Sequence, residues 1–550
     1  MAAASAVELA PGQTLAPPAV WRPRINPWIV AMTVTLATFM EVLDSSIANV
    51  ALPHIAGGLG ATQDEATWVL TAYLVANAII LPAGAYMTGF IGRKKFYMIC
   101  VALFGISSAL CGLAPTLPLL VFCRVLQGIG GGGLAPSEQA ILADTFPPEK
   151  RGQAFAMYGL AVVCAPAIGP TLGGYITDNF DWRWIFYLNV PICLLSLYLT
   201  SRIVEDPPWV EKQVKEAKKG GLKLDFLGFG LLGLTFGSLE FVLDKGQEDD
   251  WFSSRLIVFF VTMCVVAFVT MIWWELKQLR EGHRPILNLT LFTRRQFAIS
   301  FILMFVLGFS LYGTTVLIPQ FVQTLMGYTA ELAGKVLSPA GFMMMAMMPV
   351  VGFLSGKIDP RKLIGYGFFM LTISLLWMTN LNLQLSYGQL VIMRMFQASG
   401  LAFLFIPINT IAYIGVKQTE SNDVSGLTNL ARNIGGSCGT AFMATMLIRR
   451  TAAHENSMTR NLTTANPGFN AQVKALAGAF KAGNGAGPVG GGPSQGAMHA
   501  AQAYIYQQMH RQAANLGYVD IIRDLMVFCA CMIPVLFFIP KPPKHVQAGH

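Results

Sequence analysis

Long apolar runs alternate with short polar loops along the whole chain. A helix that crosses a bilayer needs roughly 20 mostly apolar residues. Fourteen runs meet this length, at about 28–53, 66–88, 96–114, 117–141, 154–176, 184–203, 226–244, 255–276, 297–325, 334–355, 362–380, 388–411, 424–448 and 519–539. The pattern predicts an all-α integral membrane protein with fourteen transmembrane helices.

The loops between the runs differ in their basic residues. Lys and Arg gather in alternate loops and near both ends of the chain, whereas the loops at 54–65, 115–116 and 381–387 contain none. Because basic residues are retained on the cytoplasmic side, this alternation predicts that both termini lie in the cytoplasm. It also accounts for the net charge of +9 without a nucleic-acid partner, because the charge lies in membrane loops rather than on one face.

The composition agrees with a membrane protein. Of the 550 residues, 54% are hydrophobic and 12% are charged, against about 25% charged residues in soluble domains. The nine cysteines all fall in apolar runs without metal-ligand spacing, and the seven histidines lie outside the centres of these runs. We therefore expect no metal or other cofactor. A membrane enzyme or receptor is disfavoured because the sequence shows no nucleophile motif and no soluble catalytic domain.

Two parts of the chain are weakly similar at an offset of about 266–270 residues, as membrane transporters with internal repeats often are. Three pairs of motifs support the repeat, namely Arg124-x-x-Gln127 with Arg394-x-x-Gln397, Asn49–Pro53 with Thr315–Pro319, and Ile168-Gly169 with Ile434-Gly435. The repeat predicts two related six-helix halves with two further helices inserted between them.

The runs, the charges and the repeat together predict the organisation of the chain. It comprises a cytoplasmic amino-terminal tail (1–27), a first six-helix half (28–203), a cytoplasmic linker with two inserted helices (204–296), a second six-helix half (297–540) with a flexible periplasmic loop (449–518), and a cytoplasmic tail (541–550). Within the periplasmic loop, the Ala- and Gln-rich segment Ala497–Asn515 favours a helix. That helix either caps the outer face or docks a periplasmic partner.

Several motifs resemble the major facilitator superfamily, and more narrowly its 14-helix drug:proton antiporters. They are the basic loop Gly92-Arg93-Lys94-Lys95, the Arg124-x-x-Gln127-Gly128 of the fourth run, Leu43–Pro53 in the first, Ala165–Gly174 in the fifth and Trp182–Pro191 opening the sixth. Leu243–Gly246, followed by Asp250–Ser254, is similar to the EmrB-like members. The resemblance covers nearly all of residues 28–540 and implies the major facilitator fold.

The resemblance also implies a function. It implies a proton-coupled antiporter that exports hydrophobic or amphiphilic drugs across the bacterial inner membrane by alternating access, driven by the proton gradient without a cofactor. A periplasmic adaptor (membrane fusion protein) and an outer-membrane channel are the implied partners, and the implied transport unit is a monomer. One departure concerns the basic loop, where Ala85 and Gly89 replace the family's first glycine and its acidic residue. A cytoplasmic charge latch built on that acid is therefore not expected.

Charged residues inside apolar runs are the first candidates for proton coupling, because a charge within the membrane is costly. Asp44 and Arg124 lie about 13 and 10 Å from the outer ends of their runs, at a rise of about 1.5 Å per residue. We expect Asp44 to carry the proton and Arg124, helped by Gln127, to tune its proton affinity. Glu41 lies one turn before Asp44 and either titrates with it or contacts cationic drugs. The alternatives are a permanent Asp44–Arg124 pair that fixes helix packing and a wet, cavity-facing Glu41.

The repeat bears on where the proton is carried. When Pro53 is aligned with Pro319, Asp44 falls on Ser310, so the second half keeps Arg394 but lacks the carboxylate. We therefore expect proton coupling in the first half alone.

Polar and aromatic residues inside apolar runs are candidates for drug binding, since a small-molecule site needs apolar walls with a few polar groups. The candidates are Tyr73, Asn77, Tyr312, Gln320, Asn409 and Arg432. In the resembled antiporters, the motif that here contains Gly169, Pro170, Gly173 and Gly174 marks exporters. Its residues lack bulk or, at Pro170, a backbone donor, which permits close helix approach and a bend.

Other functions remain as alternatives. The chain could export one endogenous compound, such as a siderophore, a fatty acid or a secondary metabolite. Proton-coupled uptake is disfavoured by the exporter motif, and a passive channel would show flux that neither saturates nor depends on protons.

Overall fold

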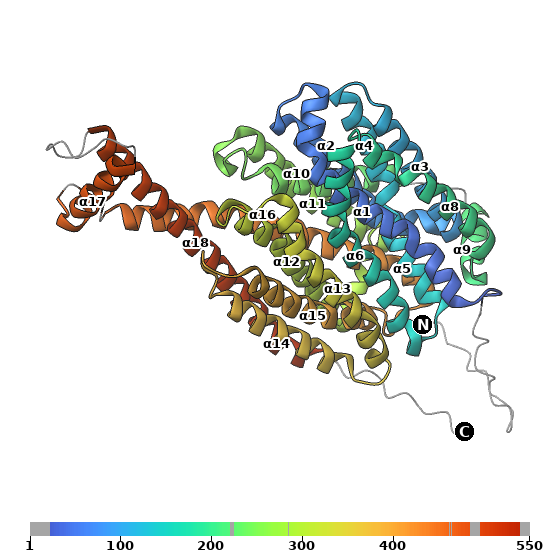
Figure 1. Ribbon diagram of the computed structural model, residues 1–550. Helices are drawn as coiled ribbons and strands as arrows, with labels where there is room; N and C mark the ends of the chain where they lie inside the picture. Colours follow the sequence, from blue (N-terminus) through green and yellow to red (C-terminus); the bar gives the residue numbers. More distant parts are fainter. Residues whose placement is uncertain are drawn as a thin grey trace.

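The described part of the chain is all helical. The computed structural model describes residues 23–219, 225–283, 285–460, 462–463, 465–483 and 495–539 (Figure 1). The predicted tails at 1–27 and 541–550 and the Gly-rich stretch 483–493 therefore lie wholly or largely outside the described residues. No strand occurs in the described ranges.

The first half contains four long helices and two pairs of shorter consecutive helices. Its helices are α1 (Pro27–Leu59), α2 (Gln63–Ile91), α3 (Arg93–Leu113), α4 (Leu117–Gly132) followed by α5 (Leu134–Thr145), α6 (Arg151–Asn179), and α7 (Trp184–Tyr187) followed by α8 (Asn189–Ile203). A 3-10 turn, η1 (Pro148–Lys150), precedes α6. The predicted fourth run is thus two consecutive helices, and so is the sixth.

Two inserted helices separate the halves. The connection contains α9 (Pro208–Lys219), α10 (Phe226–Lys245), η2 (Trp251–Ser253), α11 (Arg255–Arg280) and η3 (Leu289–Thr293). The second half contains α12 (Arg295–Thr324), α13 (Ala330–Ser355), α14 (Pro360–Met378), α15 (Tyr387–Ala412), η4 (Gln418–Glu420), α16 (Ser421–Thr459), α17 (Pro467–Gly483), α18 (Gln495–Val535) and η5 (Leu536–Phe538).

All fourteen predicted runs coincide with helices, but fewer pass a stricter test of length and hydropathy. Within the described residues, eleven helices are long and apolar enough to cross a membrane. The bent helix α6 raises the number to twelve when Arg151–Pro166 and Thr171–Asn179, which meet at 42°, count as one span. The other two are α14, whose first turn contains Arg361 and Lys362, and the more polar α16. The count of fourteen and the cytoplasmic termini therefore stay predictions.

Local sequence signals explain where several helices begin. Thr62 and Glu65 form a capping box at the start of α2, and Ser386 and Gln389 form another at the start of α15. In such a box, two side chains satisfy backbone N–H groups that have no partner within the helix. The caps therefore fix the register at which each chain segment enters its helix.

The same helix pairs pack in each half. In the first half α1 packs on α6, and α4 packs on both α2 and α3; in the second half α12 packs on α16, and α15 packs on both α13 and α14. Figure 1 shows the first half, from blue to teal, beside the second half, from yellow to orange. The internal repeat of the sequence thus has a counterpart in helix packing.

The two halves meet along two seams. One seam joins α6 to α13, where a Cβ added at Gly152 would lie 2.9 Å from Ser355 Cβ. The other joins α2 and α5 to α16, where the Asn422 side-chain amide donates a hydrogen bond of 2.6 Å to Thr88 Oγ1. These contacts lie at the predicted cytoplasmic end, so the halves are closed together at that end.

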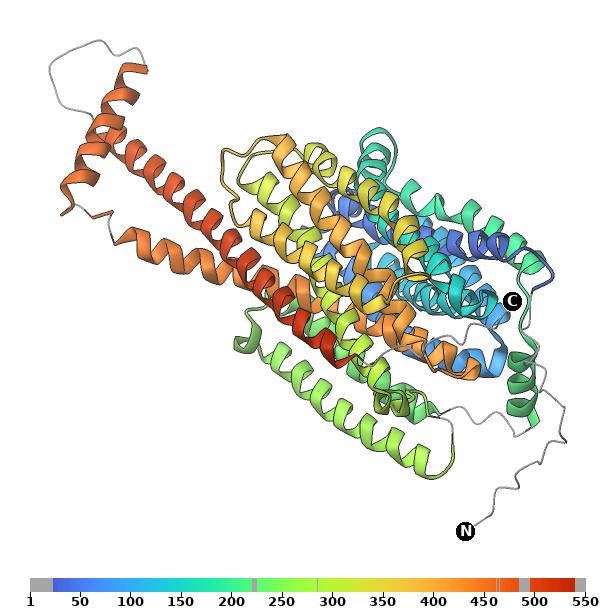
Figure 2. The same ribbon diagram turned by 90° about the horizontal axis from the view of Figure 1, so that it is seen from below.

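The inserted helices cover the second of these seams. Helix α10 packs against both α2 and α16. The Ser437 hydroxyl of α16 donates to Glu240 Oε1 at 2.6 Å, and Lys245 Nζ donates to Thr67 Oγ1 of α2 at 2.5 Å. Figure 2 shows α10 and α11, in green, along one flank of the molecule. The pair therefore ties one half to the other along that flank.

The outer parts of α16 and α18, together with α17, form an arm that projects away from the helix bundle (Figures 1 and 2). Ala497–Asn515 forms the first part of α18, which runs without a break to Val535. It is therefore part of a projecting helix rather than a separate helix lying on the outer face. At the tip, Val473 and Ala477 of α17 pack against Ala501 and Ile505 of α18.

Polar contacts between α16 and α18 hold the base of the arm together. His454 of α16 contacts Asp520 of α18 at 2.8 Å, and Glu455 contacts His510 at 2.9 Å. Arg450 and Asp524 add a third pair at 3.3 Å. The hydrogen bond with His510 lowers the pKa of Glu455 below its ordinary value.

Candidate functional site

A buried carboxylate with three side-chain partners lies in the first half. Asp44 of α1 is only 3% exposed. Arg124 Nη1 donates to its Oδ2 at 2.6 Å, while Gln127 Nε2 and Asn189 Nδ2 donate to its Oδ1 at 3.0 and 2.6 Å. The structure therefore brings Asp44, Arg124 and Gln127 together and adds Asn189 to them.

Arg124 is held from several sides. Its Nε donates to the carbonyl oxygen of Val69 at 3.0 Å, and its Nη1 also donates to Gln127 Oε1 at 2.8 Å. The guanidinium carbon lies 4.4 Å from the ring centroid of Tyr73, a favourable cation–π position. Only Nη2 of the guanidinium is buried without a hydrogen-bond partner. A charge pair bonded to this extent tolerates burial, whereas either member alone would not.

Asn189 is the member of this network that sequence reasoning missed. It lies at the start of α8, where its amide also donates to Ser108 Oγ of α3 at 3.0 Å. Its position within the Trp182–Pro191 motif was the available signal, but that motif carried only a family resemblance. The Asp44 network thus joins α1, α4 and α8 directly and α3 through Ser108.

Glu41 lies in a second polar group, one turn before Asp44. It accepts hydrogen bonds from Tyr73 Oη and Asn77 Nδ2, each at 3.1 Å. Tyr73 therefore bonds directly to Glu41 through its hydroxyl, and its ring contacts Arg124, the partner of Asp44. Tyr73 and Asn77, which were predicted to bind drugs, instead form hydrogen bonds with the carboxylate of Glu41 and do not form a separate apolar wall.

Arg432 takes part in a polar chain that crosses between the halves. Its Nη1 donates to the Tyr158 hydroxyl of α6 at 2.7 Å, and that hydroxyl donates to Asn429 Oδ1 at 3.0 Å. Asn429 Nδ2 in turn donates to Gln139 Oε1 of α5 at 2.8 Å. The chain links α16 to both α5 and α6.

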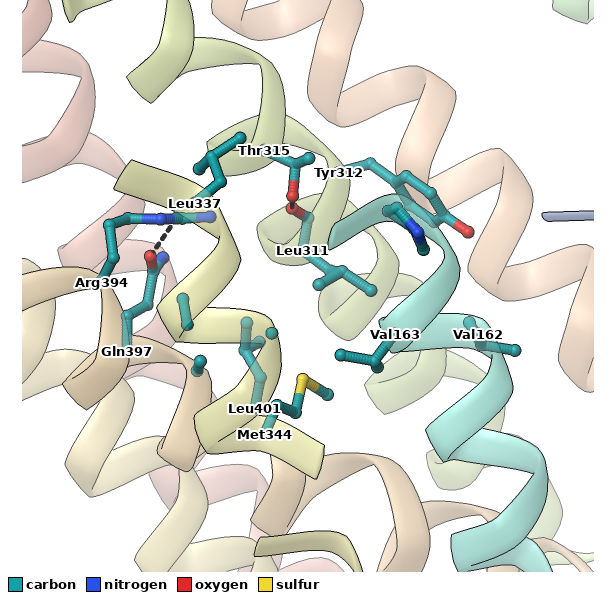
Figure 3. A pocket seen from close by; sticks show the side chains of 14 residues that line it. Val162, Val163, Leu311, Tyr312, Thr315, Leu337, Met344, Arg394, Gln397 and Leu401 are labelled. Carbon is teal, nitrogen blue, oxygen red and sulfur yellow. Dashed lines mark hydrogen bonds between the residues drawn. The ribbon is translucent and has the colours of Figure 1, made fainter. Parts of the chain in front are cut away.

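The other predicted drug-binding residues do not share one cavity. Tyr312 lines a cavity of about 100 Å³ between α6, α12, α13 and α15 (Figure 3). Gln320 lines a separate cavity of about 730 Å³ at the base of the arm. Asn409 is fully buried and donates to the carbonyl oxygen of Phe405 on its own helix at 2.9 Å. The predicted set is therefore dispersed over the bundle.

The basic loop Gly92-Arg93-Lys94-Lys95 is anchored by acids that sequence reasoning did not name. Arg93 forms a buried ion pair with Asp144 at the end of α5, and Lys94 N donates to Asp206 Oδ1 at 3.0 Å. Burial raises the pKa of Asp206, which lies in the loop before α9. Asp144 Oδ1 also accepts a hydrogen bond from Ser421 of α16 at 3.3 Å. An acidic contact between the halves therefore exists although Gly89 is not an acid.

The glycine motif of α6 faces α1. A Cβ at Gly169 would lie 2.3 Å from Ser46 Oγ, and one at Gly173 would lie 3.1 Å from Ile47 Cγ2. Gly174 has open space at the same position. Pro170 lies within the bend of α6, and its side chain is outside the described residues. Two of the three glycines thus permit the close approach of α6 to α1.

Comparison with known proteins identifies the family. The sequence profile of the Major Facilitator Superfamily matches residues 34–440. The chain belongs to the major facilitator superfamily. The solved structure of the proton:xylose symporter XylE, of the same superfamily, superposes with a TM-score of 0.56 at 15% identity, over 94% of this chain and 96% of the symporter. This likeness supports the fold.

Curated relatives of this superfamily protein include bacterial resistance proteins. The multidrug export protein EmrB of Escherichia coli K12 is 36% identical over 451 residues, 82% of this chain and 86% of its own. The fatty acid resistance protein FarB of Neisseria gonorrhoeae is 33% identical over 534 residues, 94% of this chain and 97% of its own. With its many membrane-spanning helices, the chain is a multi-pass protein of the bacterial inner membrane.

Proposed function

We propose that the protein is a proton-coupled multidrug exporter that moves hydrophobic and amphiphilic compounds across the inner membrane by alternating access. The observation that best supports proton coupling is the buried Asp44 network, because an ionisable residue inside a membrane domain is by default a candidate functional site. The similarity to EmrB, whose name describes multidrug export, supports the substrate class.

The hydrogen bonds of Asp44 suggest how a proton changes the protein. The ionised carboxylate accepts hydrogen bonds from Arg124 and Gln127 of α4 and from Asn189 of α8. Protonation neutralises the partner of Arg124 and converts one acceptor oxygen into a donor. The helices α1, α4 and α8 then lose part of the interaction that holds them in one arrangement.

The structure is closed at the predicted cytoplasmic end, and this shows which of the two arrangements of the halves is present. In the arrangement that the structure shows, the Ser421 hydroxyl of the second half donates to Asp144 of the first half, which also forms an ion pair with Arg93, and this hydrogen bond joins the halves at that end. We propose that binding of solute and binding of the proton to Asp44 favour opposite arrangements of the halves. The proton gradient then drives export without a cofactor.

The second half contributes no equivalent carboxylate. Ser310 stands where the repeat places Asp44, and it is fully buried with its Oγ 3.4 Å from Cys529 Sγ. Proton exchange in our proposal is therefore confined to the first half.

A narrower substrate range is the second candidate. The name of FarB describes resistance to fatty acids, which supports the alternative that the protein exports one endogenous compound, such as a fatty acid, rather than a broad range of drugs. Resistance of cells to structurally unrelated compounds would exclude this candidate.

Partners outside the membrane complete the proposal. We propose that a periplasmic adaptor binds the arm formed by α16, α17 and α18, because this arm reaches furthest from the bundle. An outer-membrane channel would continue the path, and the transport unit itself would be a monomer.

Transport in proteoliposomes tests proton coupling. Under an imposed pH gradient, uptake of a fluorescent lipophilic cation and of a lipophilic weak acid is compared between the parent and Asp44→Asn. We expect saturable, gradient-driven transport by the parent and loss of the gradient-driven part in Asp44→Asn, because the amide cannot exchange the proton. Asp249→Asn, at an exposed loop position, serves as the matched control and should behave as the parent.

Two results would overturn the proposal. Saturable transport that ignores the gradient and survives Asp44→Asn excludes proton coupling through this residue. Flux that rises linearly with concentration in the parent indicates a channel.

A further inference from the structure

The cavity between α6, α12, α13 and α15 contains one charged residue. Fourteen residues line its volume of about 100 Å³, and most of them are apolar. Figure 3 shows the guanidinium of Arg394 beside Gln397 at one end and apolar side chains such as Val163 and Met344 at the other. None of the lining residues is acidic.

Arg394 lacks the anionic partner that a buried arginine normally has. It is 8% exposed, and its Nη1 donates to Gln397 Oε1 one turn further along α15. Within the described part of the chain, no carboxylate lies within ion-pair distance of Arg394, and both Arg394 Nε and Gln397 Nε2 are buried without an acceptor. The site thus has unused donors and one positive charge.

The contrast with the first half shows what is missing. Arg124 and Gln127 occupy the equivalent positions in the repeat, and both donate to Asp44. In the second half the aligned Ser310 contacts Cys529 instead. Because an unpaired charge in a low-dielectric site is costly, the arrangement favours a partner that brings the negative charge from outside the chain.

We propose that Arg394 and Gln397 bind the acid group of an anionic amphiphile, such as a carboxylate or a phenolate, as a substrate of this transporter. The proposal rests on the exporter function given above and names a substrate class for it. The guanidinium binds the acid oxygens in a charge-assisted contact, while Gln397 supplies a second donor. The apolar part of the molecule lies against Val163, Leu337 and Met344, which line the same cavity.

The size and position of the cavity fit a headgroup site. A volume of about 100 Å³ holds an acid group and a short apolar segment, whereas drug-sized pockets are about 300–1,000 Å³. Val162, Val163 and Pro166 come from the first half, and the other lining residues come from the second. An occupant therefore touches both halves across the α6–α13 seam, so its binding depends on their relative arrangement.

A binding experiment separates this proposal from a structural role for Arg394. The full-length protein in nanodiscs is titrated at neutral pH with a dansyl-labelled undecanoic acid, with its methyl ester, and with radiolabelled tetraphenylphosphonium as a lipophilic cation. We expect Arg394→Gln to raise the Kd for the acid tenfold or more, because a hydrogen bond to a charged group contributes about 1.5–3 kcal/mol and each tenfold change in Kd corresponds to about 1.4 kcal/mol. The ester should bind weakly to both proteins.

Two further variants serve as controls that distinguish loss of the binding site from misfolding. Arg394→Lys keeps the charge and should restore part of the affinity for the acid. Arg24→Gln changes an arginine with an 89% exposed side chain and should leave all three affinities unchanged.

Each remaining outcome contradicts the proposal. An unchanged Kd for the acid in Arg394→Gln, an equal loss of acid and cation binding, or failure of the parent to bind the acid would overturn it. Because binding is measured without a gradient, the two proposals fail separately. If Arg394→Gln selectively weakens binding of the acid but the parent shows no proton-driven flux, the binding site stands and the exporter function is rejected. If the parent shows proton-driven flux but Arg394→Gln does not selectively weaken binding of the acid, the exporter function stands and the binding site is rejected.

Discussion

At the scale of single residues, the Asp44 network shows how a membrane interior can hold a charge. Three donors from α4 and α8 surround one carboxylate, and each offsets part of the desolvation that burial imposes. Tyr73 donates to Glu41 and lies against the Arg124 guanidinium, so it places Glu41 next to this network. Two carboxylates one turn apart therefore have different partners, which allows them different roles.

The glycines of α6 provide a test at the same scale. Gly169→Ala places a methyl group against Ser46, whereas Gly174→Ala places one in open space. Overpacking typically costs about 1–3 kcal/mol, while a substitution into open space usually stays within about 0.5 kcal/mol. We expect Gly169→Ala to lower the midpoint of thermal unfolding in detergent and Gly174→Ala to leave it nearly unchanged. Equal midpoints for the two variants would show that α6 and α1 do not approach closely at Gly169.

At the scale of elements, helices could be predicted from the sequence far better than their contacts. Apolar runs locate helices, and counting at about 1.5 Å per residue suggested that Asp44 and Arg124 lie at one depth. The rotation of each helix about its axis is set by packing of the whole bundle, so Asn189, Asp144 and Asp206 could not be assigned as partners. For the same reason Tyr312 and Gln320, predicted for one site, line two different cavities.

The base of the arm is an element whose stability should depend on pH. Glu455 has its pKa lowered from 4.5 in the folded protein by the hydrogen bond with His510. A carboxyl group with a lowered pKa stabilises the fold above its unfolded pKa, and this contribution is lost as the pH falls through the folded value. We expect protection of the outer parts of α16 and α18 from hydrogen exchange to decrease below about pH 4.5, after correction for intrinsic exchange rates.

Glu455→Gln provides the comparison for this pH effect. The amide keeps a polar side chain but cannot titrate, so its protection should change less between pH 5 and 3.5 than that of the parent. Identical pH profiles for the two proteins would show that the Glu455–His510 pair does not hold the arm.

At the scale of the whole molecule, the arm and the bundle are separable in role. The tip of the arm has its own small apolar cluster, formed by α17 and the start of α18, whereas the Asp44 network and the Arg394 cavity lie within the bundle. A change at the tip therefore leaves the interior contacts of the bundle intact.

Replacing residues 465–505 by a short Gly-Ser linker tests this separation. We expect the shortened protein to retain gradient-driven transport in proteoliposomes, because the proton and solute sites are untouched, but to lose co-purification with a co-expressed periplasmic adaptor. Val473→Asp, which disturbs the apolar cluster at the tip, should weaken co-purification in the same direction. Full retention of the adaptor by the shortened protein would exclude the tip as its binding surface.

The inserted helices have a consequence for the route by which solutes arrive. Because α10 covers the α2–α16 seam and α11 packs on α10, molecules dissolved in the lipid meet a barrier on that flank, whereas no described helix lies over the α6–α13 seam in the same way. Lipophilic solutes in the bilayer are therefore expected to approach along the α6–α13 flank rather than along the covered one. For lipophilic solutes that reach the protein from the bilayer, the concentration in the membrane determines how much of the binding site is occupied. The oil–water partition coefficient of a solute therefore contributes to selectivity before any side chain does.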